Sequence, residues 1–321
     1  MYSYENYSQV KGKIEKRRTD ARAEADYRNE MLREKSPEIA KIDAELSSTG
    51  LLLFKAACSG GSVAEIRERN AALCKRRKEV VVSLGYPEDY TEVKYTCGKC
   101  SDTGFDEDGK MCSCFKEELV KATIASSGIG KLIEKQSFEN FDLDWYKKTP
   151  GSYDRMAAIL AEAKLYVKNF PKKRGNLLLL GTTGTGKTHI STSIAADVIK
   201  QGYDVVYDTA QNIFSDFEFD RFKNGYGREE SRCDKYMECD LLIIDDLGTE
   251  FSSQFTLSCL YNLINTRQNR GLGTIISTNL DVDDLSERYE ARIYSRLLGE
   301  NCKVLPFDGV DHRLFGKTGR K

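Results

Sequence analysis

Long hydrophobic runs are the first feature that this sequence lacks. Apolar runs such as those at residues 51–54 and 177–180 are much shorter than the roughly 20 apolar residues that a helix needs to cross a bilayer. The opening residues, 1–5, contain no apolar segment of the kind that forms a secretory signal. We therefore expect a cytoplasmic protein with no membrane partner.

The chain also contains few histidines and no excess of positive charge. The chain has two histidines, His189 and His312, so a histidine-based catalytic triad or a histidine-ligated zinc protease site is unsupported. Its 49 basic residues are matched by 50 acidic ones, so any contact with nucleic acid must come from a local patch. A length of 321 residues suits two domains, and a hydrophobic fraction of 40% suffices for a sizeable core.

A glycine-rich segment at residues 181–188 is the most informative feature present. It follows an apolar run at 176–180 and precedes a helical pattern at 189–200, which is the strand–loop–helix context of a phosphate-binding loop. The glycines let successive N–H groups point at phosphates, and the helix presents its positive end. Lys187 can reach the β- and γ-phosphates, and Thr188 can ligate Mg²⁺. The residues predicted to bind the nucleotide are Gly181, Thr182, Thr183, Gly184, Thr185, Gly186, Lys187 and Thr188.

A second stretch, residues 240–246, joins four apolar residues to the acids Asp245 and Asp246. This pattern predicts a buried parallel strand that ends at the carboxyl edge of an α/β sheet, where ligands bind. Asp245 would hold Mg²⁺ together with Thr188, and Asp246 would orient or polarise the attacking water. Two acids in a loop are usually just solvated, but the phosphate-binding loop in the same chain favours the catalytic interpretation.

Polar and basic residues after the next predicted strand, 274–278, extend this pattern. Asn279 could hydrogen-bond the γ-phosphate or the attacking water. Arg288, Arg292 and Arg296 recur four residues apart, so they would share one face of a helix. Such a face is usually solvated or salt-bridged, but beside an ATPase site it could donate an arginine to a neighbouring subunit's γ-phosphate.

Four of the ten cysteines are clustered: Cys97 and Cys100 form a C-x-x-C pair, and Cys112 and Cys114 form a C-x-C pair. The turn-rich segment between the pairs would let four thiolates surround Zn²⁺. A redox pair or unrelated thiols are the alternatives, but a redox C-x-x-C usually opens a helix in a βαβ unit, and that context is absent. We expect a structural zinc site, because four protein ligands leave no position open for chemistry.

Two further segments each leave two interpretations open. Residues 1–88 predict helices with narrow apolar stripes and much charge, which suits either a solvated arm packed on itself or a module that docks on a partner. Residues 214–223 interleave four phenylalanines with charges of both signs. These aromatic residues could stack on the bases of single-stranded nucleic acid, or they could pack a helix onto the sheet.

Taken together, these motifs resemble the DnaC/DnaI-type helicase loaders of the AAA+ ATPases. The resemblance covers the chain from about Phe138 onward, and the zinc module of such loaders resembles the segment from 85 to 115. It implies that residues 181–188 are Walker A, that Asp245 and Asp246 are Walker B, and that Asn279 is the sensor I residue. It further implies that Arg292 and Arg296 fall in the arginine-finger motif, with Arg296 the preferred finger, and that Arg313 is the sensor II arginine.

The resemblance implies an α/β fold: an AAA+ P-loop core with a parallel sheet flanked by helices, preceded by a helical arm and a small zinc knuckle. The expected parts are an arm at 1–88, a zinc-binding module at 89–120, a linker at 121–155 and the ATPase domain at 156–321. The implied cofactors are ATP, Mg²⁺ and Zn²⁺.

The implied activity is slow ATP hydrolysis, since Asp246 stands where many AAA+ relatives carry glutamate. The implied function is ATP-dependent loading of the replicative hexameric DNA helicase onto single-stranded DNA, with self-association through the ATP site. The alternatives are an IstB-type transposition helper ATPase and an adaptor that binds ATP without hydrolysing it.

Overall fold

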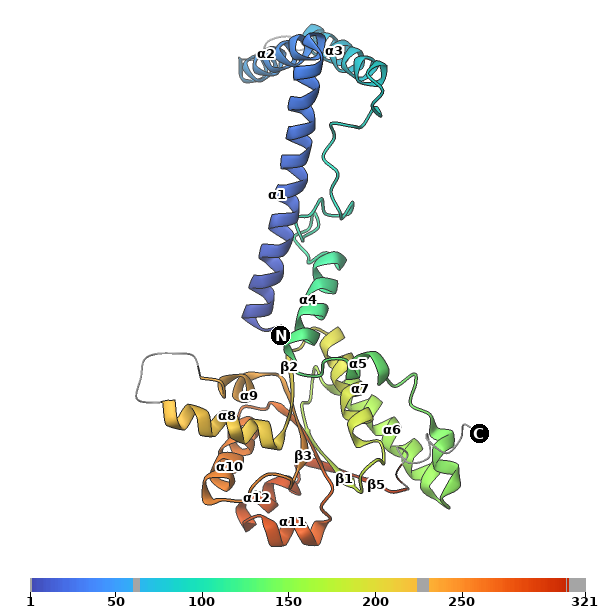
Figure 1. Cartoon of the computed structure of the whole chain (residues 1–321), viewed down its shortest axis with the longest axis vertical. Coiled ribbons are helices and arrows are strands. Elements are labelled where there is room, and N and C mark those ends of the chain that lie inside the picture. The colour runs from blue at the N-terminus through green and yellow to red at the C-terminus, as the bar shows by residue number, and fades with distance from the viewer. Residues whose placement is uncertain (1, 60–63, 224–230, 310, 312–321) are drawn as a thin grey trace. The chain divides into compact units, whose positions relative to one another are not determined.

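The computed structural model describes residues 2–59, 64–223, 231–309 and 311. It divides the chain into two compact units (Figure 1). One unit comprises Gln9–Phe115, and the other comprises Met1–Ser8 with Lys116–Lys321. The two units are called the N-terminal unit and the core unit below.

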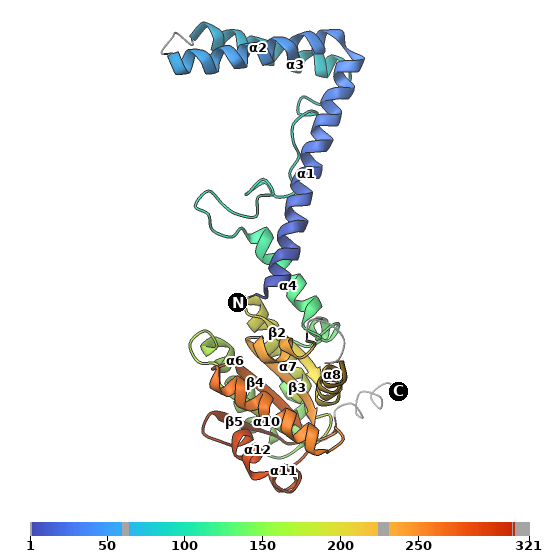
Figure 2. The ribbon, with the colours of Figure 1, turned by 90° about the vertical axis from the view of Figure 1, so that its left-hand side faces the viewer.

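The N-terminal unit is built on three helices, α1 (Tyr4–Lys35), α2 (Pro37–Ser59) and α3 (Ala64–Ser83). Ser36 accepts a hydrogen bond from the Ile39 amide at 3.3 Å, so it caps α2 and places Pro37 at the first helical position. Helices α2 and α3 lie side by side (Figure 2). A small buried cluster joins the three helices: Leu32, Ile39, Ile42, Val80 and Val81.

The core unit contains a five-stranded parallel sheet and the helices around it. The strands are β1 (Asn176–Gly181), β2 (Val205–Thr209), β3 (Leu241–Leu247), β4 (Gly273–Thr278) and β5 (Cys302–Phe307). The helices are α4 (Ser113–Ser126), which begins in the N-terminal unit, α5 (Leu132–Lys135), the 3₁₀ helix η1 (Leu143–Lys148), α6 (Ser152–Asn169), α7 (Lys187–Lys200), α8 (Ala210–Lys223), α9 (Asp234–Glu238), α10 (Gln254–Asn269), α11 (Val282–Arg288) and α12 (Ala291–Leu297).

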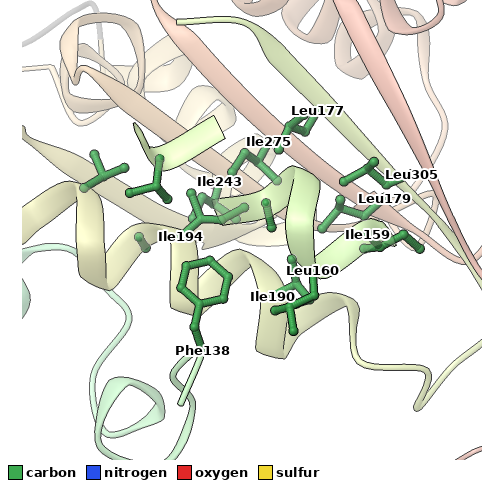
Figure 3. Packing of buried hydrophobic residues seen from close by; sticks show 14 of the residues in the cluster. Phe138, Ile159, Leu160, Leu177, Leu179, Ile190, Ile194, Ile243, Ile275 and Leu305 are labelled. Carbon is green, nitrogen blue, oxygen red and sulfur yellow. The ribbon is translucent and has the colours of Figure 1, made fainter. Parts of the chain in front are cut away.

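The strand order is β2-β3-β4-β1-β5, and every pairing is parallel. Alternate side chains of a strand point to opposite faces, so the sheet has two cores. Leu177 and Leu179 face α6 and α7 (Figure 3), whereas Leu178 and Leu180 face α8 to α12. This confirms the predicted α/β core, a parallel sheet flanked by helices.

Two elements of the core unit differ from what the sequence pattern indicates. Residues 115–135 read as one helix in the sequence, but the structure interrupts it: α4 ends at Ser126, and α5 begins at Leu132. Gly128 between them has a φ of +80°, which a continuous helix does not allow. Strand β5 was not predicted, because Cys302–Phe307 includes a proline and lacks a continuous apolar run. Among the described helices, none is both long and apolar enough to cross a membrane.

Candidate nucleotide-binding site

The glycine-rich loop lies where the sequence predicts it, at the carboxyl edge of the sheet. Strand β1 ends at Gly181 and helix α7 begins at Lys187, so the loop closes the gap between them. Gly186 has a φ of +99°, and a Cβ added there would lie 2.6 Å from the Tyr146 hydroxyl. A side chain is therefore excluded, and the backbone can approach a phosphate at the amino end of α7.

Lys187 is held inside this loop by three oxygens. Its Nζ donates to the carbonyl oxygens of Gly181 at 2.5 Å and Thr182 at 2.8 Å. It also donates to Oδ1 of Asn279 at 2.8 Å. The fold thus brings together two predicted site residues that are far apart in the sequence. The ammonium group is poised over the loop, where phosphates would replace some of these acceptors.

Asp245 ends the buried part of β3 and is itself 6% exposed. The Thr188 hydroxyl donates to its Oδ2 at 3.4 Å. Two further hydroxyl groups donate to the same carboxylate, that of Tyr207 to Oδ2 and that of Ser277 to Oδ1. Carboxylate and hydroxyl oxygens are the ligands that Mg²⁺ prefers, so the pair of Thr188 and Asp245 fits the predicted magnesium site.

Asp246 follows in a conformation that is unusual for a residue with a side chain, with a φ of +53°. The register between β3 and β4 is shifted between Ile244 and Leu247, and the Asp246 amide donates to the Ser277 hydroxyl at 3.0 Å. Asp246 faces a cavity of about 240 Å³, which would accept the phosphates and the attacking water. The cavity is lined by Gln136, Thr183, Gly184, Gly186, Lys187, Thr188, His189, Asp246 and Asn279.

Tyr207 and Ser277 were not singled out from the sequence as residues that hold Asp245. Ser277 follows the apolar residues of β4, and Tyr207 ends the apolar run of β2, so both positions lie toward the sheet edge where ligands bind. Burial, followed by the nearby Asp245 carboxylate, raises the pKa of Tyr207. The phenol therefore stays protonated and acts as a hydrogen-bond donor.

The segment from Ser137 to Tyr146, which precedes the strands of the core, also contributes residues to the site that the sequence analysis missed. The His189 ring is hydrogen-bonded to the Ser137 carbonyl oxygen at 2.9 Å and packs edge-on against Phe141. The Tyr146 hydroxyl donates to the Thr185 carbonyl oxygen at 2.9 Å. Phe141, Tyr146 and His189 border a second cavity of about 250 Å³, which also includes Trp145 and shares Gly184 and Gly186 with the first. The segment carries no spacing motif, so only its position before the phosphate loop could have indicated it.

Of the predicted arginines that the structure describes, none lines either cavity. Arg288 contacts Glu250, donating to its carbonyl oxygen at 2.6 Å. Arg292 and Arg296 lie on α12, where both guanidinium groups pack on the Tyr261 ring. Arg296 also donates to Oδ1 of Asn265 from Nε at 3.1 Å and from Nη2 at 2.9 Å. Arg313 lies outside the described residues.

The aromatic segment at 214–223 forms part of α8, and its phenylalanines divide between the two predicted environments. Phe214 is 4% exposed and belongs to the core, and Phe217 packs against the same cluster. Phe219 and Phe222 are 39% and 82% exposed. The Arg232 guanidinium lies 3.7 Å from the centre of the Phe219 ring, so basic and aromatic groups are adjacent on this surface.

The four clustered cysteines come together in the N-terminal unit. Their sulfur atoms all lie within 4.8 Å of one another, with Cys97 and Cys112 at 3.9 Å and Cys100 and Cys114 at 3.6 Å. Tetrahedral zinc with Zn–S bonds of 2.3 Å requires separations of about 3.8 Å. The four thiols therefore fit a structural zinc ion.

Asp102 organises the backbone that carries these cysteines. It is fully buried with a φ of +52°, and it accepts hydrogen bonds from the Thr96 amide at 2.8 Å and the Cys97 amide at 3.0 Å. Arg17 of α1 lies 2.6 Å from the same carboxylate. Burial opposes the charge of Arg17, but Asp102 and Cys114 outweigh it and raise the pKa of Arg17.

Comparison with known proteins defines the class. A family model described as IstB-like ATP binding protein matches residues 122–315, which is more than half of the chain. The chain therefore belongs to the family of IstB-like ATP-binding proteins. The matched segment includes the phosphate loop, both acids of β3, Asn279 and all the predicted arginines.

Individual relatives add a narrower resemblance. The replicative helicase loader DnaC of Escherichia coli (strain K12) is 26% identical over 200 residues, which cover 62% of this chain and 78% of DnaC. The phage-like element PBSX protein XkdC of Bacillus subtilis (strain 168) is 26% identical over 228 residues, covering 65% and 82%. A crystal structure of the DnaC helicase loader aligns with a TM-score of 0.47 at 21% identity, over 56% of this chain and 100% of that chain. The family match and the sequence similarity to DnaC confirm the resemblance to DnaC-type AAA+ loaders that the motifs predict.

Proposed function

We propose that this chain hydrolyses ATP and uses it to load the replicative hexameric DNA helicase onto single-stranded DNA. The observation that carries the ATPase part is the convergence of Lys187, Asn279 and Asp246 on one cavity beside Asp245. Each residue comes from a different segment of the chain. The similarity to DnaC supports the choice of helicase loading among the functions that such a site can serve.

The arrangement of the site residues supports a role for each. Backbone N–H groups of residues 181–188 and the ammonium of Lys187 would hold the phosphates. Thr188 and Asp245 would hold Mg²⁺, which would supply positive charge to the phosphates. Asp246 orients the attacking water and accepts its proton, while the Asn279 amide holds the γ-phosphate or that water in line.

Arg296 completes the site of a neighbouring copy in this proposal. In its own chain the Arg296 guanidinium packs on the Tyr261 ring, and no arginine of the described residues lines the cavity. We therefore expect the arginine that stabilises the transition state to come from another copy. Self-association would then switch hydrolysis on.

Single-stranded DNA would contact the exposed part of α8. Phe219 and Phe222 offer stacking surfaces, Arg232 offers positive charge beside the Phe219 ring, and Arg221 offers positive charge over the Phe255 ring of α10. Aromatic rings that alternate with basic groups bind single strands with little sequence preference. The N-terminal unit, with its helices α2 and α3 and its zinc site, would grip the helicase.

A loading experiment with the full-length chain tests the proposal. The replicative helicase is incubated with circular single-stranded DNA, the chain and ATP, and the DNA-bound helicase is separated by gel filtration. We expect more helicase on DNA with ATP than without nucleotide. Phe222→Ala should weaken retention of the chain on DNA, whereas Leu165→Ala, which removes an exposed apolar side chain on α6, should not. Equal helicase on DNA with and without the chain would refute the loader function.

The family match supports a second candidate, a helper ATPase for transposition of the IstB type. It would have the same ATP site and DNA contacts but would serve a transposase. The cysteine cluster and the helices before residue 122 lie outside the family match and favour the loader. Stimulation of strand transfer by a transposase, with no effect on helicase loading, would favour the helper instead.

A further inference from the structure

The Tyr207 side chain contacts Asp245, one of the two residues that fit the predicted magnesium site. Its hydroxyl donates to Oδ2 of Asp245, the same oxygen that accepts from Thr188 at 3.4 Å. Both Tyr207 and Asp245 are buried, at 9% and 6% exposure. A carboxylate oxygen accepts two good hydrogen bonds, so the phenol occupies one direction and leaves the other facing Thr188.

The backbone of the same residue carries the end of helix α4. Strand β2 is at the edge of the sheet, and Tyr207 pairs with Ile243 on one side only. On its other side the Tyr207 amide donates to the Ser127 carbonyl oxygen at 2.7 Å, just after α4 ends (Figure 1). At this edge of the sheet, the Ser127 carbonyl oxygen therefore accepts the hydrogen bond that a further strand would otherwise accept.

Gly128 brings the chain after α4 into close contact with the backbone of Tyr207. Its φ is +80°, and a Cβ added there would lie 2.3 Å from the Tyr207 carbonyl oxygen. Ser127 is fully buried, and its hydroxyl accepts from the Ile129 amide at 3.3 Å. The chain after α4 therefore cannot slide along β2 without moving the backbone of Tyr207.

We propose that Tyr207 is a positioning residue that couples the end of helix α4 to metal binding by Asp245. The inference rests on the proposed function, because it assumes that Asp245 helps to hold Mg²⁺ beside the nucleotide. Helix α4 includes Cys114 of the zinc cluster, so the same helix also carries a ligand of the other candidate metal site. Displacement of the α4 end would rotate the phenol away from Oδ2 and release the carboxylate from its metal-binding orientation.

Coupling of this kind is reciprocal. Binding of the metal–nucleotide complex should hold the Asp245 carboxylate in one orientation. The carboxylate would then hold the Tyr207 hydroxyl, and the hydrogen bond between Tyr207 and Ser127 would become more stable. Hydrogen exchange of the full-length wild-type chain measures this without any substitution. Mg²⁺ with ADP should slow exchange in segments 122–130 and 205–209 more than ADP with a chelator does. Equal exchange in the two conditions would overturn the coupling.

The variant Tyr207→Phe removes the hydroxyl and keeps the ring. Its matched control is Tyr166→Phe, because the Tyr166 hydroxyl donates to the Gly175 carbonyl oxygen at 2.8 Å and lines neither site cavity. The readout is Mn²⁺ affinity in the presence of ADP, measured by electron paramagnetic resonance, together with ADP affinity in the presence of a chelator. Tyr207→Phe should weaken Mn²⁺ binding about 10-fold, the scale seen when a residue behind a metal ligand is lost. ADP affinity without metal should not change, and Tyr166→Phe should alter neither value.

Three outcomes separate the possibilities. Wild-type Mn²⁺ affinity in Tyr207→Phe would overturn the positioning role while leaving the proposed function intact. Equal loss of ADP affinity with and without metal would show a structural role only, and would also overturn it. If the wild-type chain binds ADP with no metal dependence, the proposed ATP site itself fails.

Discussion

The Nζ atom of Lys187 donates a hydrogen bond to Oδ1 of Asn279 at 2.8 Å. This bond joins helix α7 after the phosphate loop to the residue that follows β4, at the carboxyl edge of two neighbouring strands. The lysine and the asparagine therefore share one position where a γ-phosphate would lie. Nucleotide would draw the ammonium toward phosphate oxygens and free the amide to contact the γ-phosphate or the water.

Substitution of the two partners should separate binding from turnover. Lys187→Ala should abolish ATP binding, because the loop loses the cation that faces the phosphates. Asn279→Ala should retain ATP binding but lower turnover about 100-fold, which is typical when one transition-state donor is removed. Fluorescent-nucleotide titration and phosphate release measure the two effects. Loss of ATP affinity in Asn279→Ala as large as that in Lys187→Ala would contradict this division of roles.

Asp246→Asn tests whether the chain is an enzyme or a nucleotide-switched adaptor. The amide keeps the shape of the side chain but cannot accept a proton from water, so hydrolysis should stop while ATP remains bound. Steady-state phosphate release and ATP affinity are compared in the wild type and the variant. If neither protein releases phosphate although both bind ATP, the adaptor is the better description.

Loss of zinc should unfold the knuckle without emptying the nucleotide site. Cys97→Ser removes one of four ligands, so the zinc content should fall from one ion per chain and the unfolding midpoint of the N-terminal unit should drop. Cys74→Ser is the matched control, because Cys74 is an exposed cysteine of the same unit outside the cluster. Metal analysis, limited proteolysis and ATP titration are the measurements. Full zinc content in Cys97→Ser would exclude the site, and loss of ATP binding would refute the independence of the two sites.

Mixing two inactive variants tests whether Arg296 acts on a neighbour. Lys187→Ala keeps the arginine but cannot bind ATP, whereas Arg296→Ala keeps the ATP site but cannot supply the arginine. Mixed assemblies contain contacts in which an intact site meets an intact arginine, so phosphate release should partly recover. Arg292→Ala in place of Arg296→Ala shows which arginine matters. Absence of recovery with both would exclude a role in trans for either.

Asp204 should make the core unit less stable as the pH rises. Burial first, and then the nearby Asp240 carboxylate, raise the pKa of Asp204 to about 6. The unfolded chain has the ordinary aspartate pKa of about 3.9, so folding favours the protonated form and stability falls between about pH 4 and pH 6. Asp204→Asn should therefore raise the free energy of unfolding at pH 7.5 by at most about 3 kcal/mol, with no gain near pH 4.

Urea unfolding at both pH values measures this change, and Asp154→Asn provides an exposed aspartate in the same unit as a control. A gain in Asp204→Asn that is the same at pH 4 and at pH 7.5 would show that ionisation of Asp204 is not the cause.

The sequence predicted the parts of the site that depend on local pattern. The loop at 181–188 and the acids Asp245 and Asp246 follow apolar runs that must be buried strands, so their place at the sheet edge follows from the pattern itself. Partners contributed by other strands were not predictable. Tyr207 and Ser277 have no spacing motif, and they meet at Asp245 because β2, β3 and β4 are neighbours in the sheet.

The sequence also could not predict whether a side chain is buried or exposed where its pattern was compatible with either. In α8 the phenylalanines divide between core and solvent according to helical phase, which places Phe214 inward and Phe222 outward. The ion pair between Arg17 and Asp102 joins α1 to the cysteine segment, and neither local sequence predicts it.

The strand order also has a consequence for synthesis on the ribosome. Strand β1 is complete at Gly181, but its partners β4 and β5 begin at Gly273 and Cys302. The leucines at 177–180 must therefore leave the ribosome long before the strands that cover their edges. During that interval the nascent chain exposes an unpaired, aggregation-prone β segment next to an unformed phosphate loop. Production of active protein should accordingly depend on chaperones and on the speed of translation through residues 182–272.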